Sequence, residues 1–170
     1  MRILALDCGT KTGWCVADDQ KIIESGVLHF PLNRGESPGM RFLRFRAELV
    51  GLLQLTRPEI ICYEQAHHRG GAATEVSVGM TTRVQEIAAQ SGIDVFPCHS
   101  GTLKKWATGK GNADKPAMCA VAATFLGREP EDDNEADAVC LARWVVAVLL
   151  STGPSDNGNI EEASNGTGKH

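Results

Sequence analysis

The sequence has no hydrophobic run long enough to cross a membrane. Its longest apolar stretch, residues 138–150, contains Arg143 and is shorter than the roughly 20 residues that a spanning helix needs. Asp7 interrupts the first apolar run, so we expect no signal peptide. We therefore expect no membrane partner and interpret residues 138–150 as a core helix.

Paired cysteines are also missing. The six cysteines are widely spread and form no Cys-x-x-Cys motif. Most lie in apolar runs, where a free cysteine acts as a small hydrophobic residue. This placement argues against a disulfide framework and indicates a reducing, cytoplasmic location.

The chain also lacks an excess of basic residues. Its formal net charge of −4 at first argues against a nucleic-acid partner. Residues 153–170 account for −2 of it, which leaves −2 for residues 1–152. Two bound divalent cations would bring that body to +2, so charge does not exclude nucleic acid. Four lysines lie close together in the sequence: Lys104, Lys105, Lys110 and Lys115.

The order of predicted elements is that of an α/β domain with a mixed sheet. Apolar runs predict a hairpin over residues 2–17, whose first strand ends at Asp7, and a third strand over residues 21–30. Two further strands then alternate with five helices: strands 59–64 and 93–97, and helices 41–55, 75–90, 100–106, 115–126 and 134–150. We expect one domain over residues 1–152 and a disordered, polar and acidic tail over residues 153–170.

Acidic side chains end two of the predicted strands, Asp7 on the first and Glu64 on the strand 59–64. If these strands are parallel neighbours, both carboxylates lie at the edge where α/β proteins form ligand sites. Asp137, in an otherwise apolar helix face, is a third candidate. Converging carboxylates raise one another's pKa values unless a cation intervenes. Such oxygen ligands suit Mg²⁺ or Mn²⁺, and a pair of these metals hydrolyses phosphodiesters.

Each acidic residue, taken alone, also has a purely structural explanation. Asp7 can begin a tight turn, and Glu64 can be an ion-pair partner. Asn134 and Asp137 are spaced nearly as in a capping box. The lysines, likewise, are of a type that is commonly solvated. Only the joint occurrence of the acidic residues and the lysines favours a catalytic site.

Together, the acidic segments resemble the three motifs of RuvC-type Holliday junction resolvases, members of the ribonuclease H-like superfamily. The segments occur in the family's order: residues 3–17 with Asp7, residues 60–65 with Glu64, and residues 134–142 with Asp137. Lys104 and Lys115 also show the eleven-residue spacing of two functional lysines of the bacterial family. The last motif looks most similar to that of the phage-type members.

The resemblance, which covers roughly residues 1–150, implies a ribonuclease H-like fold: a five-stranded mixed sheet flanked by helices on both faces. It also implies a metal-dependent, structure-selective crossover junction endodeoxyribonuclease. Such an enzyme cuts four-way (Holliday) or other branched DNA by two-metal phosphodiester hydrolysis. Two Mg²⁺ ions per active site, replaceable by Mn²⁺, would be the cofactors, with no small-molecule cofactor. A homodimer in the cytosol of a bacterium or a phage-infected host is implied as well.

The resemblance assigns residues by role. Asp7, Glu64 and Asp137 would bind the metals. Bacterial resolvases have a fourth acid where this chain has Asn134, so either Asn134 or Asp133 would complete the catalytic metal site. Lys115 would serve both in catalysis and in DNA binding. The residues expected at the nucleic acid are Lys104, Lys105, Lys110, Lys115, His67, His68 and Arg69.

Two departures from the family, at Asn134 and at His67, leave other functions open. His67 stands where those enzymes carry a phenylalanine wedge, and it would stack on a base less strongly. A YqgF-like nuclease acting on structured RNA is one alternative, because its first motif is similar. A non-catalytic junction-binding protein, in which Asn134 marks a decayed site, is another. A phosphotransferase of the actin and sugar-kinase superfamily is disfavoured, because the chain is too short for two such domains.

Overall fold

The computed structural model of the chain describes residues 1–65 and 70–152. The predicted DNA contacts His67, His68 and Arg69 and the predicted tail 153–170 lie outside the described residues. The elements follow in the order β1 (Arg2–Asp7), β2 (Lys11–Asp18), β3 (Lys21–His29), α1 (Gly39–Thr56), β4 (Ile60–Glu64), α2 (Ala72–Ser91), β5 (Asp94–Cys98), α3 (Ser100–Thr108), α4 (Lys115–Leu126) and α5 (Asp133–Thr152).

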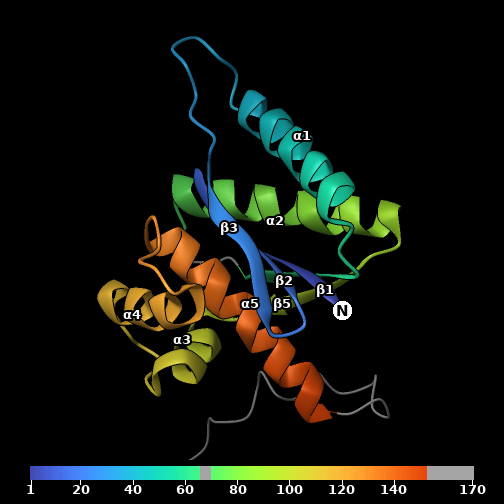
Figure 1. Ribbon diagram of the computed structural model, residues 1–170. Helices are drawn as coiled ribbons and strands as arrows, with labels where there is room; N and C mark the ends of the chain where they lie inside the picture. The colour runs from blue at the N-terminus through green and yellow to red at the C-terminus, as the bar shows by residue number, and fades with distance from the viewer. Residues whose placement is uncertain (66–69, 153–170) are drawn as a thin grey trace, which may run out of the picture.

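The strands form one sheet in the order β3-β2-β1-β4-β5, which lies between helices α2 and α5 (Figure 1). β1 pairs antiparallel with β2 and parallel with β4, and β5 joins β4 in parallel. The predicted five-stranded mixed sheet is therefore confirmed. The parallel pairing places Leu6 beside Tyr63, so the next residues, Asp7 and Glu64, come at the same end of adjacent strands.

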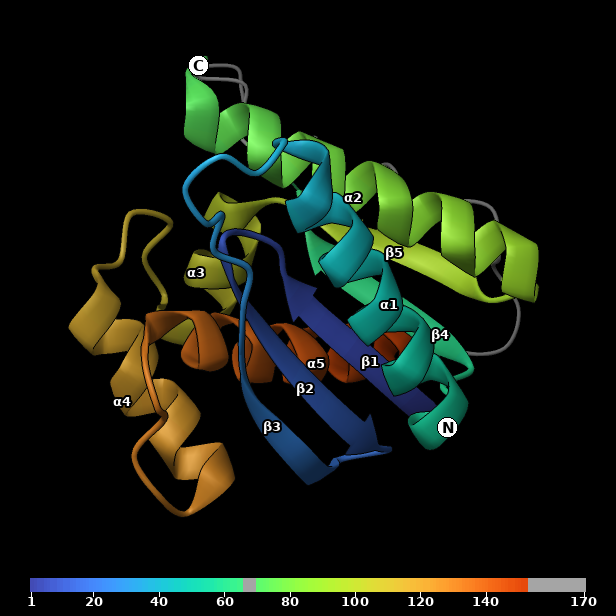
Figure 2. The same ribbon diagram turned by 90° about the horizontal axis from the view of Figure 1, so that it is seen from above.

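Helices cover both faces of the sheet, as predicted (Figure 2). Because successive side chains of a strand point to opposite faces, β1 divides its apolar residues between two cores. Leu4 and Leu6 pack under α1 and α2, whereas Ile3 and Ala5 pack against α5. Alternate residues of the first strand thus join both helical layers to the sheet.

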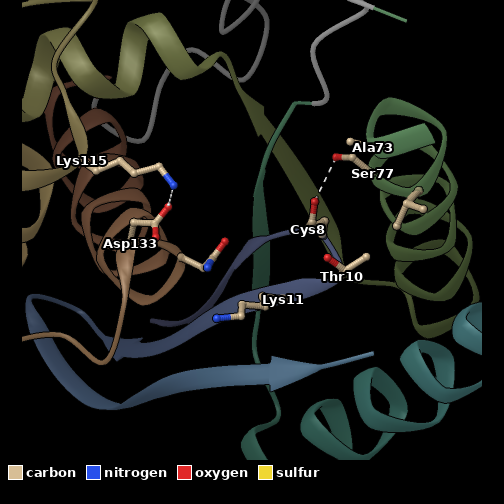
Figure 3. A pocket seen from close by; sticks show the side chains of 10 residues that line it. Cys8, Thr10, Lys11, Ala73, Ser77, Lys115 and Asp133 are labelled. Atoms are coloured by element: carbon tan, nitrogen blue, oxygen red, sulfur yellow. Dashed lines mark hydrogen bonds and ion pairs between the residues drawn. The ribbon is translucent and has the colours of Figure 1, made fainter. Parts of the chain in front are cut away.

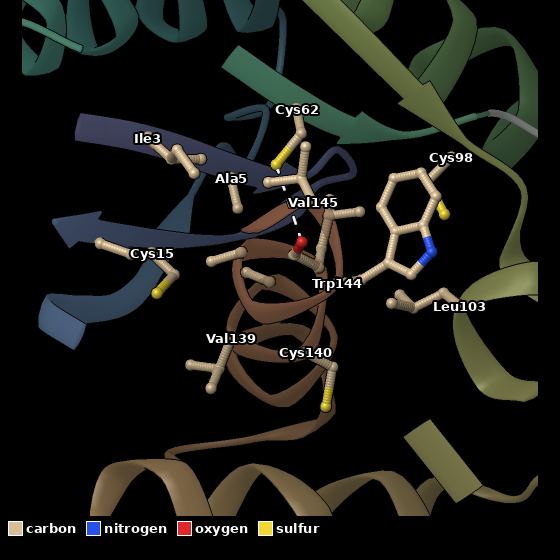
Figure 4. Packing of buried hydrophobic residues seen from close by; sticks show 14 of the residues in the cluster. Ile3, Ala5, Cys15, Cys62, Cys98, Leu103, Val139, Cys140, Trp144 and Val145 are labelled. Carbon is tan, nitrogen blue, oxygen red and sulfur yellow. Dashed lines mark hydrogen bonds between the residues drawn. The ribbon is translucent and has the colours of Figure 1, made fainter. Parts of the chain in front are cut away.

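Helix α5 is the central element of one core (Figure 4). Its residues 138–142 are completely buried between the sheet and helices α3 and α4, which explains why its sequence is apolar on most sides. The prediction of a core helix over residues 138–150 is confirmed in this part. Among the described residues, no helix combines the length and hydrophobicity that a bilayer span requires.

The cysteines follow the predicted pattern closely. Five of the six side chains are buried, and Cys119 is half-buried. Cys15, Cys62, Cys98 and Cys140 all belong to the α5 core (Figure 4). Their thiols therefore fill space among apolar side chains, as small hydrophobic residues do.

Candidate functional site

The turn between β1 and β2 holds Asp7 at the end of the sheet. Thr12 is fully buried, and its hydroxyl donates a hydrogen bond to the carbonyl oxygen of Gly9 at 2.8 Å. The Gly9 amide donates in return to the Thr12 hydroxyl at 3.3 Å. Ser77 of α2 donates to the carbonyl of Cys8 at 3.0 Å. These bonds fix the backbone on both sides of the turn that follows Asp7.

The first turn of α5 lies directly on β2, opposite Asp7. Gly13 is the residue paired with Asp7 across the hairpin. A Cβ atom at Gly13 would lie 1.8 Å from the backbone oxygen of Asn134. Only glycine permits this approach, and it brings Asp137, one helical turn further along α5, toward the same end of the sheet.

Asp7 and Asp137 both have raised pKa values, and the charge of Glu64 contributes to each. Burial, then the charges of Glu64 and Asp137, hold the pKa of Asp7 well above its ordinary value. Burial and the charge of Glu64 raise the pKa of Asp137 to about 7. One buried Asp137 oxygen, Oδ1, has no hydrogen-bond partner among the described residues. The fold thus places negatively charged carboxylates near one another at the end of β1 and β4, where they repel each other.

The carboxylate oxygens at this end of the sheet are the candidate ligands for a divalent cation. Among the residues that the structure describes, no three histidine, cysteine, aspartate or glutamate side chains already form a metal-binding group. The chemistry of the carboxylates nevertheless fits a hard cation, which takes oxygen ligands and would relieve their repulsion. The unpartnered oxygen of Asp137 offers such a cation a free ligand atom. Binding would have to draw the carboxylates closer together.

The two candidates for a fourth ligand have different surroundings. Asn134 donates its side-chain amide to Asp132 at 2.9 Å, so its side chain belongs to the start of α5. Asp133 instead forms an ion pair with Lys115 at 2.5 Å. The charge of Asp133 also raises the pKa values of both Asp7 and Asp137.

The predicted lysines separate into two groups. Lys115 begins α4 and contacts Asp133, a contact that raises the pKa of the lysine. Lys104 on α3 lies near enough for its charge to oppose the rise in the pKa of Asp137. Lys105 and Lys110 are exposed on α3 and on the loop that follows it. Two of the four lysines therefore act on the carboxylates.

A cavity of about 470 Å³ is lined by the turn that follows Asp7 and by the first residues of α5, Asp133 and Asn134. Figure 3 shows Lys115 and Asp133 on one side of it and Ala73 and Ser77 of α2 on the other. Lys11 lies between these sides, with its ammonium group turned toward α5 (Figure 3). Sequence reasoning missed Lys11, although its position directly after the Asp-Cys-Gly-Thr turn was a usable signal.

Sequence reasoning also missed Glu135, which is completely buried. Its carboxylate accepts hydrogen bonds from the Arg128 guanidinium at 2.6 and 3.1 Å. It accepts others from Ser25 at 2.6 Å and from the amide of Glu131 at 2.5 Å. Burial alone would raise the pKa of Glu135, but these bonds outweigh it and the pKa lies below the ordinary value. No local sequence pattern distinguishes Glu135 from its acidic neighbours.

Comparison with known proteins gives the family. No protein-family model matches the chain. The crossover junction endodeoxyribonuclease RuvC of Anaeromyxobacter sp. strain K is 30% identical over 149 residues, which cover 84% of this chain and 78% of that protein. This chain belongs to the RuvC family. The RuvC protein of Corynebacterium diphtheriae is 32% identical over 120 residues, 69% of this chain and 72% of the relative. That of Caldicellulosiruptor saccharolyticus is 25% identical over 84% of this chain and 90% of the relative.

Solved structures agree on the fold. The Thermus thermophilus RuvC structure matches 89% of this chain and 98% of its own, with a TM-score of 0.74 and 21% identity. A second T. thermophilus structure is RuvC in complex with a Holliday junction substrate, with a TM-score of 0.71 over 86% of this chain and 97% of that one. The yeast mitochondrial resolvase Ydc2 has a TM-score of 0.61 over 85% of this chain and 77% of its own, at 14% identity. The ribonuclease H-like fold predicted from the RuvC resemblance is thereby confirmed.

Proposed function

We propose that this RuvC-family chain is a divalent-metal-dependent endonuclease that cuts four-way DNA junctions. The proposal is supported by Asp7, Glu64 and Asp137, which come from three separate elements, and by the charge of Glu64 acting on both aspartates. A cavity lined by Lys11 and Lys115 opens at the turn that follows Asp7. The raised pKa values of Asp7 and Asp137 reflect their burial and the negative charge around them, which a cation would neutralise. Homologues of this chain are crossover junction endodeoxyribonucleases by name, and one related structure holds a Holliday junction.

In this proposal the nuclease domain spans residues 1–152, and each group has a defined role. Asp7, Glu64 and Asp137 would hold two Mg²⁺ ions, which Mn²⁺ could replace, and Asp133 is favoured over Asn134 as the fourth ligand. When bound, the metals activate a water molecule and stabilise the leaving oxygen of a phosphodiester. Lys104 and Lys115 would contact backbone phosphates, which gives affinity without base recognition. The buried surroundings of Asp7 and Asp137 would strengthen every electrostatic interaction in the site.

A homodimer is part of the proposal. Resolution of a four-way junction requires one nick in each of two symmetry-related strands, and a two-fold dimer presents two identical active sites to them. Sedimentation equilibrium of the full chain, alone and with a junction, tests this directly. A single active subunit per junction would contradict it.

The decisive experiment compares cleavage of a synthetic four-way junction, a flap DNA and a structured RNA of similar length. We expect symmetric nicks in the junction that require Mg²⁺ or Mn²⁺, mapped on denaturing gels. Preferred cleavage of RNA would instead support the YqgF-like function. Junction binding without nicking under all metal conditions would support the non-catalytic function.

Asp7→Asn is the matching variant for this experiment. It should abolish nicking while leaving the melting temperature of the metal-free protein unchanged or higher, because one of the mutually repelling carboxylates is removed. Melting in the presence of a chelator measures this. A large loss of stability would show that Asp7 has a structural role.

A further inference from the structure

Two lysines of the 470 Å³ cavity are held by two consecutive aspartates at the start of α5. Lys115 pairs with Asp133 at 2.5 Å, and Lys11 pairs with Asp132 at 3.7 Å. Lys11 and Lys115 come from β2 and α4, elements that are remote in the chain. The cap residue Asp132 and the first residue of α5, Asp133, therefore present one carboxylate to each lysine.

The two members of the Lys11–Asp132 pair are held very differently. Asp132 accepts hydrogen bonds from the backbone amides of Asn134 and Glu135 at 2.9 and 3.2 Å, and from the Asn134 side chain at 2.9 Å. Its side chain is only 22% exposed, whereas that of Lys11 is 55% exposed. The aspartate is thus fixed as the cap of α5, and the lysine is the more exposed partner.

A contact of this kind is easily exchanged for another anion. An exposed lysine–carboxylate pair contributes little to stability, because water and salt screen it and the long side chain must be held in place. A DNA phosphate offers the ammonium group an equivalent partner. When the lysine binds a phosphate, counterions condensed on the DNA are released, which favours binding. The hydroxyl of Thr10, which accompanies Lys11 at the cavity, suits the same ligand.

We propose that Lys11 is a second phosphate-binding residue of this cavity, and that Asp132 holds it in the free protein in the place that a DNA phosphate takes. The inference rests on the proposed function. It adds a contact on the β2 side of the cavity to the one expected from Lys115. The DNA backbone would then pass over the start of α5, next to the carboxylates.

The test measures junction binding by the full chain at a fixed low Mg²⁺ concentration, in an Asp7→Asn background that we expect to bind without cutting. Lys11→Gln should weaken binding and reduce the slope of log affinity against log salt by about 0.9, the value for one phosphate contact. Lys21→Gln is the matched control, because Lys21 is an exposed lysine at the opposite end of the same hairpin. Lys21→Gln should leave the junction affinity and the salt slope of the Asp7→Asn protein unchanged.

A double-mutant cycle with Asp132→Asn separates a phosphate contact from general repulsion. Asparagine keeps the capping oxygen and removes the charge, so this variant should bind the junction more tightly. If Lys11 contacts phosphate, the gain shrinks when Lys11→Gln is also present. An equal gain in both backgrounds, or a salt slope for Lys11→Gln equal to that of Lys21→Gln, overturns the inference alone. Failure of the parent to bind any junction overturns the inference and the proposed function together.

Discussion

At the scale of single residues, Asp137 makes stability depend on pH. Its pKa is about 7 in the folded chain, against an ordinary value of 3.8, so folding favours the protonated carboxyl. Its contribution to the free energy of unfolding is complete below about pH 3.8 and is lost as the pH rises through about 7. Asp7, whose pKa is also raised, acts in the same direction.

We therefore expect the metal-free protein to lose stability between pH 5 and pH 8, and Asp137→Asn to lose less. Urea unfolding midpoints in the presence of a chelator measure the difference. Asp94→Asn, which changes an exposed aspartate at the start of β5, is the control and should behave as the parent does. An identical loss in all three proteins would contradict the assignment to Asp137.

Gly13 is the residue that most directly sets the distance between α5 and the sheet. Gly13→Ala should destabilise the protein by about 1–3 kcal/mol, because the new methyl group meets the backbone of Asn134. Nicking should fall as well, since Asp137 moves with the helix. Gly51→Ala is the counterpart: nothing lies within 4 Å of that site in α1, so alanine should stabilise by about 0.5–1 kcal/mol. Thermal melts of the two variants, with opposite signs expected, test the close contact.

At the scale of elements, the start of α5 is anchored by an ion pair between the buried Glu135 and the half-exposed Arg128, and not by apolar contacts alone. Glu135 is fully buried and binds Arg128 in the α4–α5 connection and Ser25 of β3. Asp133 comes two residues before Glu135 in α5, and Asp137 comes two residues after it. We infer that this anchor supports the position of both.

Removal of Arg128 should therefore be costly. Arg128→Met leaves a buried carboxylate without its cation, and we expect the free energy of unfolding to fall by about 3 kcal/mol. Adding Glu135→Leu should recover part of this loss, because the unpaired charge is then gone. Arg34→Met, at an exposed loop position, should change stability by less than about 0.5 kcal/mol. Denaturant unfolding gives all three values, and an Arg128→Met effect no larger than that of Arg34→Met would refute the anchor.

At the scale of the whole molecule, a net-acidic chain is proposed to bind a polyanion. Residues 1–152 carry a formal net charge of −2. The candidate site itself consists mainly of acidic side chains. Divalent cations there would reverse the sign of the local field before DNA arrives. Metal binding and DNA binding should accordingly support each other.

Cation binding should also be visible without DNA. Mg²⁺ or Mn²⁺ should raise the melting temperature by mass action, and more at pH 8 than at pH 5, because protons compete for Asp7 and Asp137. Calorimetric scans with NaCl at matched ionic strength provide the control. The same shift at both pH values, or none, would show that the carboxylates do not bind the cation.

The sequence by itself determined the elements, because their signals are local. The alternation of Ile3 and Ala5 with Leu4 and Leu6 defines a strand buried on both faces, and the apolar residues 138–150 define a core helix. The order of the acidic motifs was also sufficient to predict the family and the fold.

Only the tertiary structure decided which charges meet. Ser25 and Glu135 are 110 residues apart in the chain, and Lys11 reaches Asp132 only because Gly13 lets α5 lie on β2. The different surroundings of Asp133 and Asn134 have the same origin. Such pairings depend on how a helix docks on a sheet, and docking is set by contacts between distant segments that no local pattern in the chain encodes.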